Sequence, residues 1–212
     1  MRRDVSMGLR VVVVGFALAS AALGAGAARA DALVPETTVE PQPAPYVFWP
    51  IDEVRVGAYA HNWIHDENAP VDLSVETLSS PLAFPGYAAP GIAGNPWISW
   101  FFDPRINLGA MINTGGKTSY GFGGFTWRIP IYGPVFFEGE LGGALNNAVR
   151  EPTPHRVDMG CVATFRESGG FGVQLSPNVD LIVNIEHISH ATFCSKTNPG
   201  ITDVGFRVGY KF

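Results

Sequence analysis

The stretch Ile201-Thr-Asp-Val-Gly-Phe-Arg-Val-Gly-Tyr-Lys-Phe212 ends the sequence and changes character at every second residue. In an extended strand, successive side chains point to opposite faces. One face therefore carries apolar side chains, at Val204, Phe206, Val208, Tyr210 and Phe212. The other face carries charge, at Asp203, Arg207 and Lys211. The stretch predicts a β-strand with one apolar and one charged face.

The same alternation recurs upstream, in segments separated by Gly, Pro, Asn or Ser. Eight such segments cover residues 53–64, 70–78, 104–114, 118–130, 134–146, 160–175, 179–190 and 201–212. Segments of about ten alternating residues are typical of transmembrane β-barrel strands. Two segments alternate less cleanly, and their glycines predict bends or bulges at Gly121, Gly123, Gly124, Gly169 and Gly170.

Charge on one face of every strand favours a membrane barrel, in which the apolar face meets lipid and the polar face lines the interior. We expect carboxylates and guanidinium groups to pair inside, with Glu76, Glu138, Glu140 and Glu186 facing Arg55, Arg105, Arg166 and Arg207. An eight-stranded barrel is just wide enough for side chains to fill, so the interior should be a plug. Six aromatic residues near strand ends would form interfacial girdles, namely Trp63, Trp97, Trp100, Trp127, Tyr132 and Tyr210. The alternative is a secreted eight-stranded sandwich or lipocalin-like barrel.

The N-terminus reads as an export signal. Arg2, Arg3 and Arg10 precede an apolar run from Val11 to Leu23, and residues 28–30 form an Ala-Arg-Ala cleavage site. An anchoring helix is the alternative, but the run is shorter than the roughly 20 residues that span a bilayer. We therefore expect residues 1–30 to be a signal peptide cleaved after Ala30, residues 31–50 a Pro-rich periplasmic linker, and residues 51–212 the outer-membrane barrel.

With eight strands and both chain ends in the periplasm, the odd-numbered strands run outward, so residues 187–200, after strand seven, form a loop at the outer rim. Cys161 begins the sixth strand at this rim, and Cys194 follows the seventh. The two strands are joined at the periplasmic end, so their outer ends are neighbours. Export to an oxidising compartment then predicts a Cys161–Cys194 disulfide.

The chain has a formal net charge of −5 and no basic cluster, which argues against nucleic-acid binding. His61, His65 and Asp66 could mimic metal ligands, but nothing completes a zinc set, and a rim loop is the commoner explanation. Residues 113–118 faintly resemble a phosphate loop, but lack its glycine spacing and the following helix. The sequence predicts neither a cofactor nor a metal.

Strand seven carries a candidate for chemistry on its apolar face. Leu181, Val183 and Ile185 precede His187 and Ser189 on that face. Alternate residues of a strand lie about 7 Å apart with both side chains on one side. An imidazole nitrogen can then reach a serine oxygen, the geometry of a nucleophile and its base. Alone, the pair is a weak signal, and ordinary interfacial polarity is the commoner explanation.

A family resemblance strengthens this reading. His187-Ile-Ser-His-Ala191, Asn198-Pro-Gly-Ile-Thr-Asp203 and Gly205-Phe-Arg-Val-Gly-Tyr-Lys-Phe212 together resemble the C-terminal signature of the PagL-type lipid A deacylases, also called acyloxyacyl hydrolases. Upstream pieces resemble the alphaproteobacterial branch: Val54-Arg-Val-Gly57 with His61 and His65, Asp103-Pro-Arg105 leading to Asn113-Thr-Gly115, and Cys161 followed by Phe165-Arg-Glu-Ser168. The resemblance covers about residues 51–212.

The resemblance implies an eight-stranded outer-membrane barrel that hydrolyses the ester-linked acyl chain at the 3-position of lipid A in the outer leaflet. It implies Ser189 as nucleophile and His187 as general base, on the lipid-facing wall. Asn198 would donate a hydrogen bond to the oxyanion. A homodimer is left open.

Two departures from the family pattern leave the third catalytic group open. The founding members have Asn directly after the serine, where this chain has His190, and they carry Glu where this chain has Thr202. Thr202 shares the lipid-facing parity, whereas Asp203 should point inward. The group that orients His187 is therefore Thr202, Asp203 or none. The rival functions are an inactive structural or surface barrel and a small transport or adhesion barrel.

Overall fold

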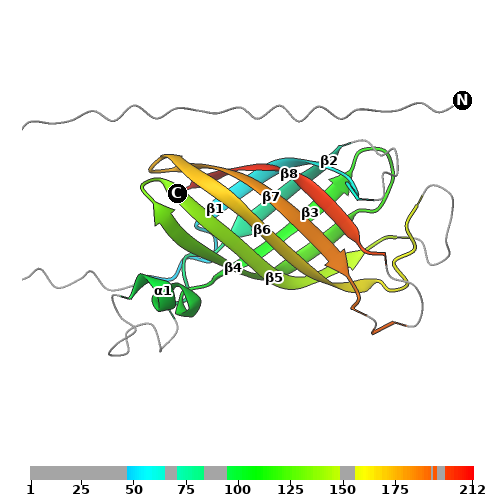
Figure 1. Cartoon of the computed structure of the whole chain (residues 1–212), viewed down its shortest axis with the longest axis horizontal. Helices are drawn as coiled ribbons and strands as arrows, with labels where there is room; N and C mark the ends of the chain where they lie inside the picture. Colours follow the sequence, from blue (N-terminus) through cyan, green and yellow to red (C-terminus); the bar gives the residue numbers. More distant parts are fainter. Residues whose placement is uncertain (1–46, 65–70, 84–94, 149–155, 192, 195–198) are drawn as a thin grey trace, which may run out of the picture. The chain divides into compact units, whose positions relative to one another are not determined.

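The computed structural model describes residues 47–64, 71–83, 95–148, 156–191, 193–194 and 199–212. These residues form a closed barrel in which each strand pairs antiparallel with its sequence neighbours and β8 closes against β1 (Figure 1). The strands are β1 (Glu53–Ala60), β2 (Asp72–Leu78), β3 (Arg105–Asn113), β4 (Tyr120–Tyr132), β5 (Val135–Asn146), β6 (Ala163–Ser176), β7 (Val179–Ser189) and β8 (Ile201–Lys211). The predicted all-β, eight-stranded antiparallel barrel is confirmed. The predicted signal peptide and most of the predicted linker lie outside the described residues.

The strand bounds differ from the predicted ones mainly at the outer ends. Strand β1 stops at Ala60, and Asn62 in the turn after it has φ +43°. The predicted bulges at the glycines are wrong, because register shifts occur instead between Pro130 and Tyr132 and between Gln174 and Ser176, where two strand pairs approach their hairpin turns. The inward-facing Gly124 has a packing reason, since a Cβ there would collide with the backbone of residues 141 and 142.

The outer wall of the barrel is apolar. Exposed side chains at alternate strand positions include Val56, Leu73, Val75, Leu108, Ile112, Leu141, Leu145, Phe171, Val183 and Phe206. These are the faces that the alternation assigns to lipid, so the predicted parity is confirmed in the strands that alternate cleanly. Among the described residues, no helix is both long and apolar enough to cross a membrane.

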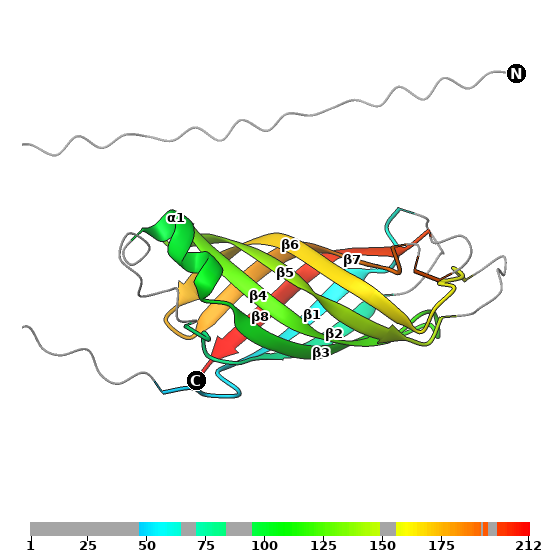
Figure 2. The ribbon, with the colours of Figure 1, turned by 90° about the horizontal axis from the view of Figure 1, so that it is seen from below.

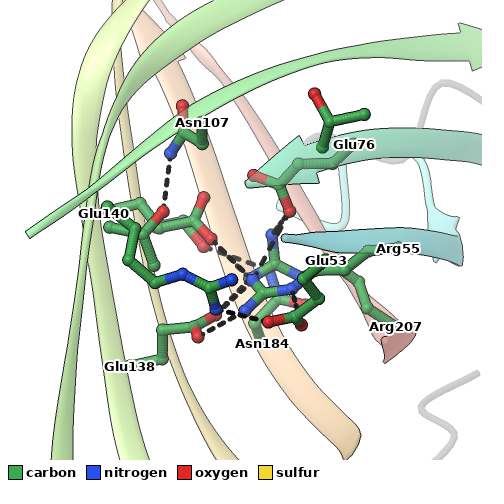
Figure 3. A network of polar contacts seen from close by, with 12 residues as sticks. Glu53, Arg55, Glu76, Asn107, Glu138, Glu140, Asn184 and Arg207 are labelled. Carbon is green, nitrogen blue, oxygen red and sulfur yellow. Dashed lines mark hydrogen bonds and ion pairs between the residues drawn. The ribbon is translucent and has the colours of Figure 1, made fainter. Parts of the chain in front are cut away.

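Charged side chains fill the middle of the barrel (Figure 3). Arg55 is fully buried, and its guanidinium group donates two hydrogen bonds of 2.7 Å to Glu138 and one of 2.6 Å to Glu53. Arg207 pairs with Glu76 at 2.9 Å and with Glu140 at 2.7 Å. Arg166 donates to both carboxylate oxygens of Glu186 and pairs with Glu140. The predicted interior pairs are confirmed for Arg55, Arg166 and Arg207, whereas Arg105 pairs with Asp52 and Glu53 instead. Together these buried pairs fill the interior as a plug.

An apolar cluster packs inside the barrel next to this network, toward the end opposite the C-terminus. It contains Tyr59, Met111, Tyr120, Phe122, Ala144, Met159, Ile188 and Ile201, all buried. Its polar atoms are partnered, since the Tyr59 hydroxyl donates to Asn184 and the Tyr120 hydroxyl lies 3.0 Å from carboxylates of Glu186 and Asp203. Polar plug and apolar cluster together make the interior a packed core.

The two ends of the barrel differ in their connections. Gly133-Pro134 and Pro177-Asn178 make short turns at the end where the C-terminus lies (Figure 1). Periplasmic turns of outer-membrane barrels are short, so we assign this end to the periplasm. The connection from β2 to β3 is an exception and contains two short helices, α1 (Pro96–Ser99) and η1 (Trp100–Phe102). Sequence alternation did not predict them. Helix η1 lies against β4 (Figure 2), where Trp127 Nε1 donates to Phe101 O at 3.1 Å.

A disulfide joins Cys161 to Cys194, as predicted. Their Cα atoms are 6.1 Å apart and they are separated by 33 residues in sequence. The bond ties the segment after β7 to the segment that leads into β6. Both segments lie at the end of the barrel opposite the short turns.

Removal of this disulfide is expected to lower the free energy of unfolding by about 3–4 kcal/mol, because a closed loop of this length restricts the unfolded chain. The variants Cys161→Ser and Cys194→Ser should each lose this amount in urea unfolding of detergent-solubilised barrel. Reductant should destabilise the wild type alone. Alkylation of both thiols in unreduced, unfolded protein would contradict the bond.

Candidate active site on the lipid-facing wall

His187 and Ser189 both project outward near the end of β7. The inward positions of this strand, at Ile182, Asn184, Glu186 and Ile188, are buried, whereas Val183 and Ile185 are exposed. The alternation continues through Ser189, which places the two polar side chains on the outer wall. Both are partly exposed. Sequence parity thus locates the pair on the wall that faces lipid.

Thr202 lies directly opposite His187 on β8, and its Oγ1 atom is 2.8 Å from His187 Nδ1. Its side chain is buried although it points outward. The turn after β1 is hydrogen-bonded to this residue, since Trp63 N donates to Thr202 O at 2.7 Å. When Nδ1 carries the proton and donates to Thr202, the lone pair of Nε2 is free to act as a base.

Gly200 packs against the Cε1–Nε2 edge of the imidazole. It has φ +68°, which favours glycine. A Cβ at this position would also lie 2.8 Å from His187 Nε2 and collide with Cε1. Glycine therefore allows the chain to pass close beside the ring. Thr202 and Gly200 together hold the ring toward β8.

The remaining predicted site residues are not gathered here. Asp203 points into the barrel, where it accepts hydrogen bonds from Asn62 N at 2.8 Å and from the Tyr120 hydroxyl at 3.0 Å. It lies on the opposite face of the sheet from His187. Asn198 lies outside the described residues. Within the described residues, no hydrogen bond joins Ser189 Oγ to the His187 ring, which is common before substrate binds.

Two hollows meet at His187 on the outer wall. The rim pocket has a volume of about 670 Å³ and is lined by Leu141, Phe165, Glu167, His187, Ser189 and Phe193, among others. The wall groove has a volume of about 580 Å³ and runs toward the periplasmic end, where Trp100, Phe101, Trp127 and Phe137 line it. The rim pocket is the more polar of the two. An amphiphile could place its head in the rim pocket and its chain in the groove.

The floor of the wall groove is made of glycine. Gly139 on β5 and Gly169 on β6 are directly paired and both face outward. A Cβ would meet nothing nearer than the Phe137 ring, at 3.5 Å from residue 139 and 3.7 Å from residue 169. Neither glycine is required by backbone packing, so their effect is to leave the groove open.

Sequence reasoning missed Glu167 as a site residue. It lies directly opposite His187 on β6, is exposed, and lines both the rim pocket and the wall groove. The signal was present in the alternation, because Phe165, Glu167 and Phe171 share the outward parity. A carboxylate at a lipid-facing position of a barrel strand is a departure that sequence parity alone can detect.

The other motifs of the sequence lie in the barrel interior, in a hairpin turn or outside the described residues. His61 lies in the interior with Asp72 and Asp203, and its Nδ1 is 2.7 Å from Asp72 Oδ2. His65 and Asp66 lie outside the described residues. Residues 113–118 form a hairpin turn in which Asn113 Oδ1 accepts hydrogen bonds from the backbone of Gly115 and Lys117. Such a turn stabilises itself and leaves these backbone donors occupied.

Comparison with known proteins gives two kinds of match. The family model described as lipid A 3-O-deacylase (PagL) matches residues 86–211. Among solved structures, the chain is similar to the outer membrane enzyme PagL, with 13% identity and a TM-score of 0.57 over 76% of this chain and 99% of that one. It is also similar to Neisserial surface protein A, with 12% identity and a TM-score of 0.48 over 78% and 97% of the two chains. No curated protein matches. These matches do not support the predicted assignment to the alphaproteobacterial branch of the family.

Proposed function

The chain belongs to the PagL family of lipid A 3-O-deacylases, and from this premise we propose that it removes the 3-O-linked acyl chain of lipid A in the outer leaflet. The observation that carries the proposal is the position of His187. Its Nδ1 is held by Thr202, and its ring lies where the polar rim pocket meets the apolar wall groove. A lipid with an ester between its head and its chain fits this junction.

In the proposed reaction, Ser189 Oγ attacks the ester carbonyl carbon while its proton passes to His187 Nε2. The tetrahedral intermediate collapses when the sugar oxygen leaves and takes that proton. Water then attacks the acyl-serine, again with His187 as base, and releases the fatty acid. Thr202 accepts the hydrogen bond from Nδ1 and so keeps the ring in the tautomer that leaves Nε2 basic. No metal ion or cofactor is required by these steps.

The test uses purified full-length protein in detergent with two substrates. Lipid A that carries ester-linked and amide-linked acyl chains should lose the mass of one hydroxy fatty acid, which appears free. Lipid A whose ester-linked chains have been removed chemically should remain unchanged. Failure of folded wild type to release any acyl chain would favour the inactive structural barrel.

Filling the wall groove is expected to change selectivity for chain length. Gly169→Leu should fit the strand, because a Cβ there has space, but its side chain would occupy the groove. We expect kcat/KM to fall at least about tenfold for lipid A with long 3-O-acyl chains and to change little for short ones, since a pocket that loses space discriminates by roughly this factor. Competition between lipid A species of different chain length, read by mass spectrometry, measures the ratio.

The matched control is Gly121→Leu. Gly121 also faces outward on the wall, a Cβ there would meet only Gly109 O at 3.8 Å, and it does not line the groove. This variant should retain the wild-type preference. Equal effects of Gly169→Leu and Gly121→Leu on the preference for chain length would show that the wall groove does not select the acyl chain.

A further inference from the structure

Glu167 is an exception on the outer wall. The eight strands lie entirely within the described residues. Among their outward-facing positions, Glu167 is the only one that is occupied by Asp, Glu, Lys or Arg. Its neighbours along the same face of β6 are Phe165, Gly169 and Phe171. Charged side chains on the lipid face destabilise a barrel, and ionisable residues within the membrane indicate function by default. The fold therefore does not explain why a glutamate occupies this lipid-facing position.

The place of Glu167 in the sheet connects it with His187. The two residues are directly opposite each other on adjacent strands, a pairing that places Cβ atoms about 4.5–5.5 Å apart on one face. Both residues line the rim pocket and the wall groove. His187 thus has a neutral hydroxyl on its β8 side, at Thr202, and a carboxylate on its β6 side.

His187 needs a negative charge that Thr202 cannot supply. When the imidazole takes the serine proton it becomes a cation, and a hydroxyl stabilises that cation less than a carboxylate does. The nearest interior carboxylates, Glu186 and Asp203, lie on the opposite face of the sheet. They are bound there by Arg166 and by Tyr120 and Asn62. Among the described residues that face the outer wall around His187, the available carboxylate is Glu167.

We propose that Glu167 is the positioning residue that stabilises the protonated form of His187 from β6, while Thr202 orients the ring from β8. The role of the single acid in a Ser–His–acid site is thereby divided between the two strands that flank β7. Thr202 supplies the hydrogen bond, and Glu167 supplies the charge. The inference rests on the proposed role of His187 and Ser189, and it concerns how that pair works in a chain with threonine opposite the histidine.

The test compares Glu167→Gln, Glu167→Asp and Asp103→Asn in the hydrolysis of lipid A. Glu167→Gln keeps the shape and removes the charge, so kcat should fall about 10- to 100-fold while KM stays within about twofold. Glu167→Asp should recover most of kcat. Asp103 follows η1 at the other end of the barrel, and its substitution should leave both constants unchanged. All three should fold, because Glu167 and Asp103 fill no interior space; the heat-modifiable shift on gels checks this.

A second measurement is independent of lipid A. A fluorophosphonate reagent labels a serine that a neighbouring base activates, so the rate at which it labels Ser189 reports on the activation of that serine without lipid A. Glu167→Gln should slow labelling by a factor similar to its effect on kcat. If the wild type labels but does not cleave lipid A, the proposed substrate is wrong, and slower labelling of Glu167→Gln still supports the inference.

Three outcomes would overturn the inference. A loss confined to KM would make Glu167 a substrate contact. Equal losses in Glu167→Gln and Glu167→Asp would show that charge is not what matters. Labelling at the wild-type rate in Glu167→Gln, or no labelling of the folded wild type, would remove Glu167 from the activation of Ser189.

Discussion

Replacing Ser189 by alanine is expected to abolish release of fatty acid from lipid A, with a fall in kcat of at least about a thousandfold. His187→Ala should be equally damaging, because the serine loses the group that takes its proton. Both side chains face outward and fill no interior space, so the barrel should remain heat-modifiable and strand-rich. Mass spectrometry of lipid A after incubation with each purified variant measures the effect.

The double variant is the sharper part of this experiment. A nucleophile and its base act as one unit, so Ser189→Ala with His187→Ala should be little worse than either single change. Val183→Ala, an outward substitution on the same strand away from both hollows, serves as the control and should retain wild-type turnover. Equal release by wild type and Ser189→Ala would end the proposed mechanism.

Replacing Arg55 by methionine is expected to lower the free energy of unfolding by about 3–5 kcal/mol, the usual result of removing one partner from a buried ion pair. Arg55 is fully buried and pairs with both Glu53 and Glu138, so its loss removes one positive charge from a buried cluster of ion pairs. Methionine retains most of the apolar stem. Urea unfolding in detergent, followed by loss of the heat-modifiable form, measures the change.

Lys211→Met provides the matched control. Lys211 is partly exposed and makes one ion pair, at 2.8 Å with Asp180, which also pairs with Arg128 at 2.7 Å. Its removal should cost less than about 1 kcal/mol. Adding Glu138→Gln to Arg55→Met should recover part of the lost stability, because it removes a buried carboxylate that has lost both hydrogen bonds from Arg55 and keeps Arg207, at 3.1 Å, and Arg128, at 3.5 Å. A cost below about 1 kcal/mol for Arg55→Met alone would show that the plug contributes little.

Alternation predicted much of the fold because a barrel wall separates two solvents, and each residue of a strand must suit one of them. The same rule placed His187 and Ser189 on the outer wall and Glu138 and Glu186 in the interior, as found. It also indicated that Asp203 points inward and Thr202 outward. Pairing across strands was accessible only where a hairpin constrained it, as for Cys161 and Cys194.

What the sequence could not provide was lateral register. Thr202 and Glu167 are 35 positions apart and flank His187 from different strands. The alternation of residues assigns Thr202 and Glu167 to the correct face of the barrel wall. It does not show that His187 is the residue that both of them lie beside. The helix η1 escaped prediction because a few residues have no measurable period, and its aromatic side chains help to line the wall groove. The glycines were read as bulges because their local chemistry is the same whether they bend a strand or leave space beside it.

The filled interior and the outward position of the site have a consequence for kinetics. With Arg55 and its partners filling the interior, the proposed substrate would reach Ser189 sideways, by diffusion within the leaflet, and its fatty acid would leave the same way. The concentration that governs saturation is then the surface mole fraction of substrate, in two dimensions. Diluting the substrate with inert detergent within a mixed micelle should slow turnover, whereas diluting the whole micelle suspension with buffer should not.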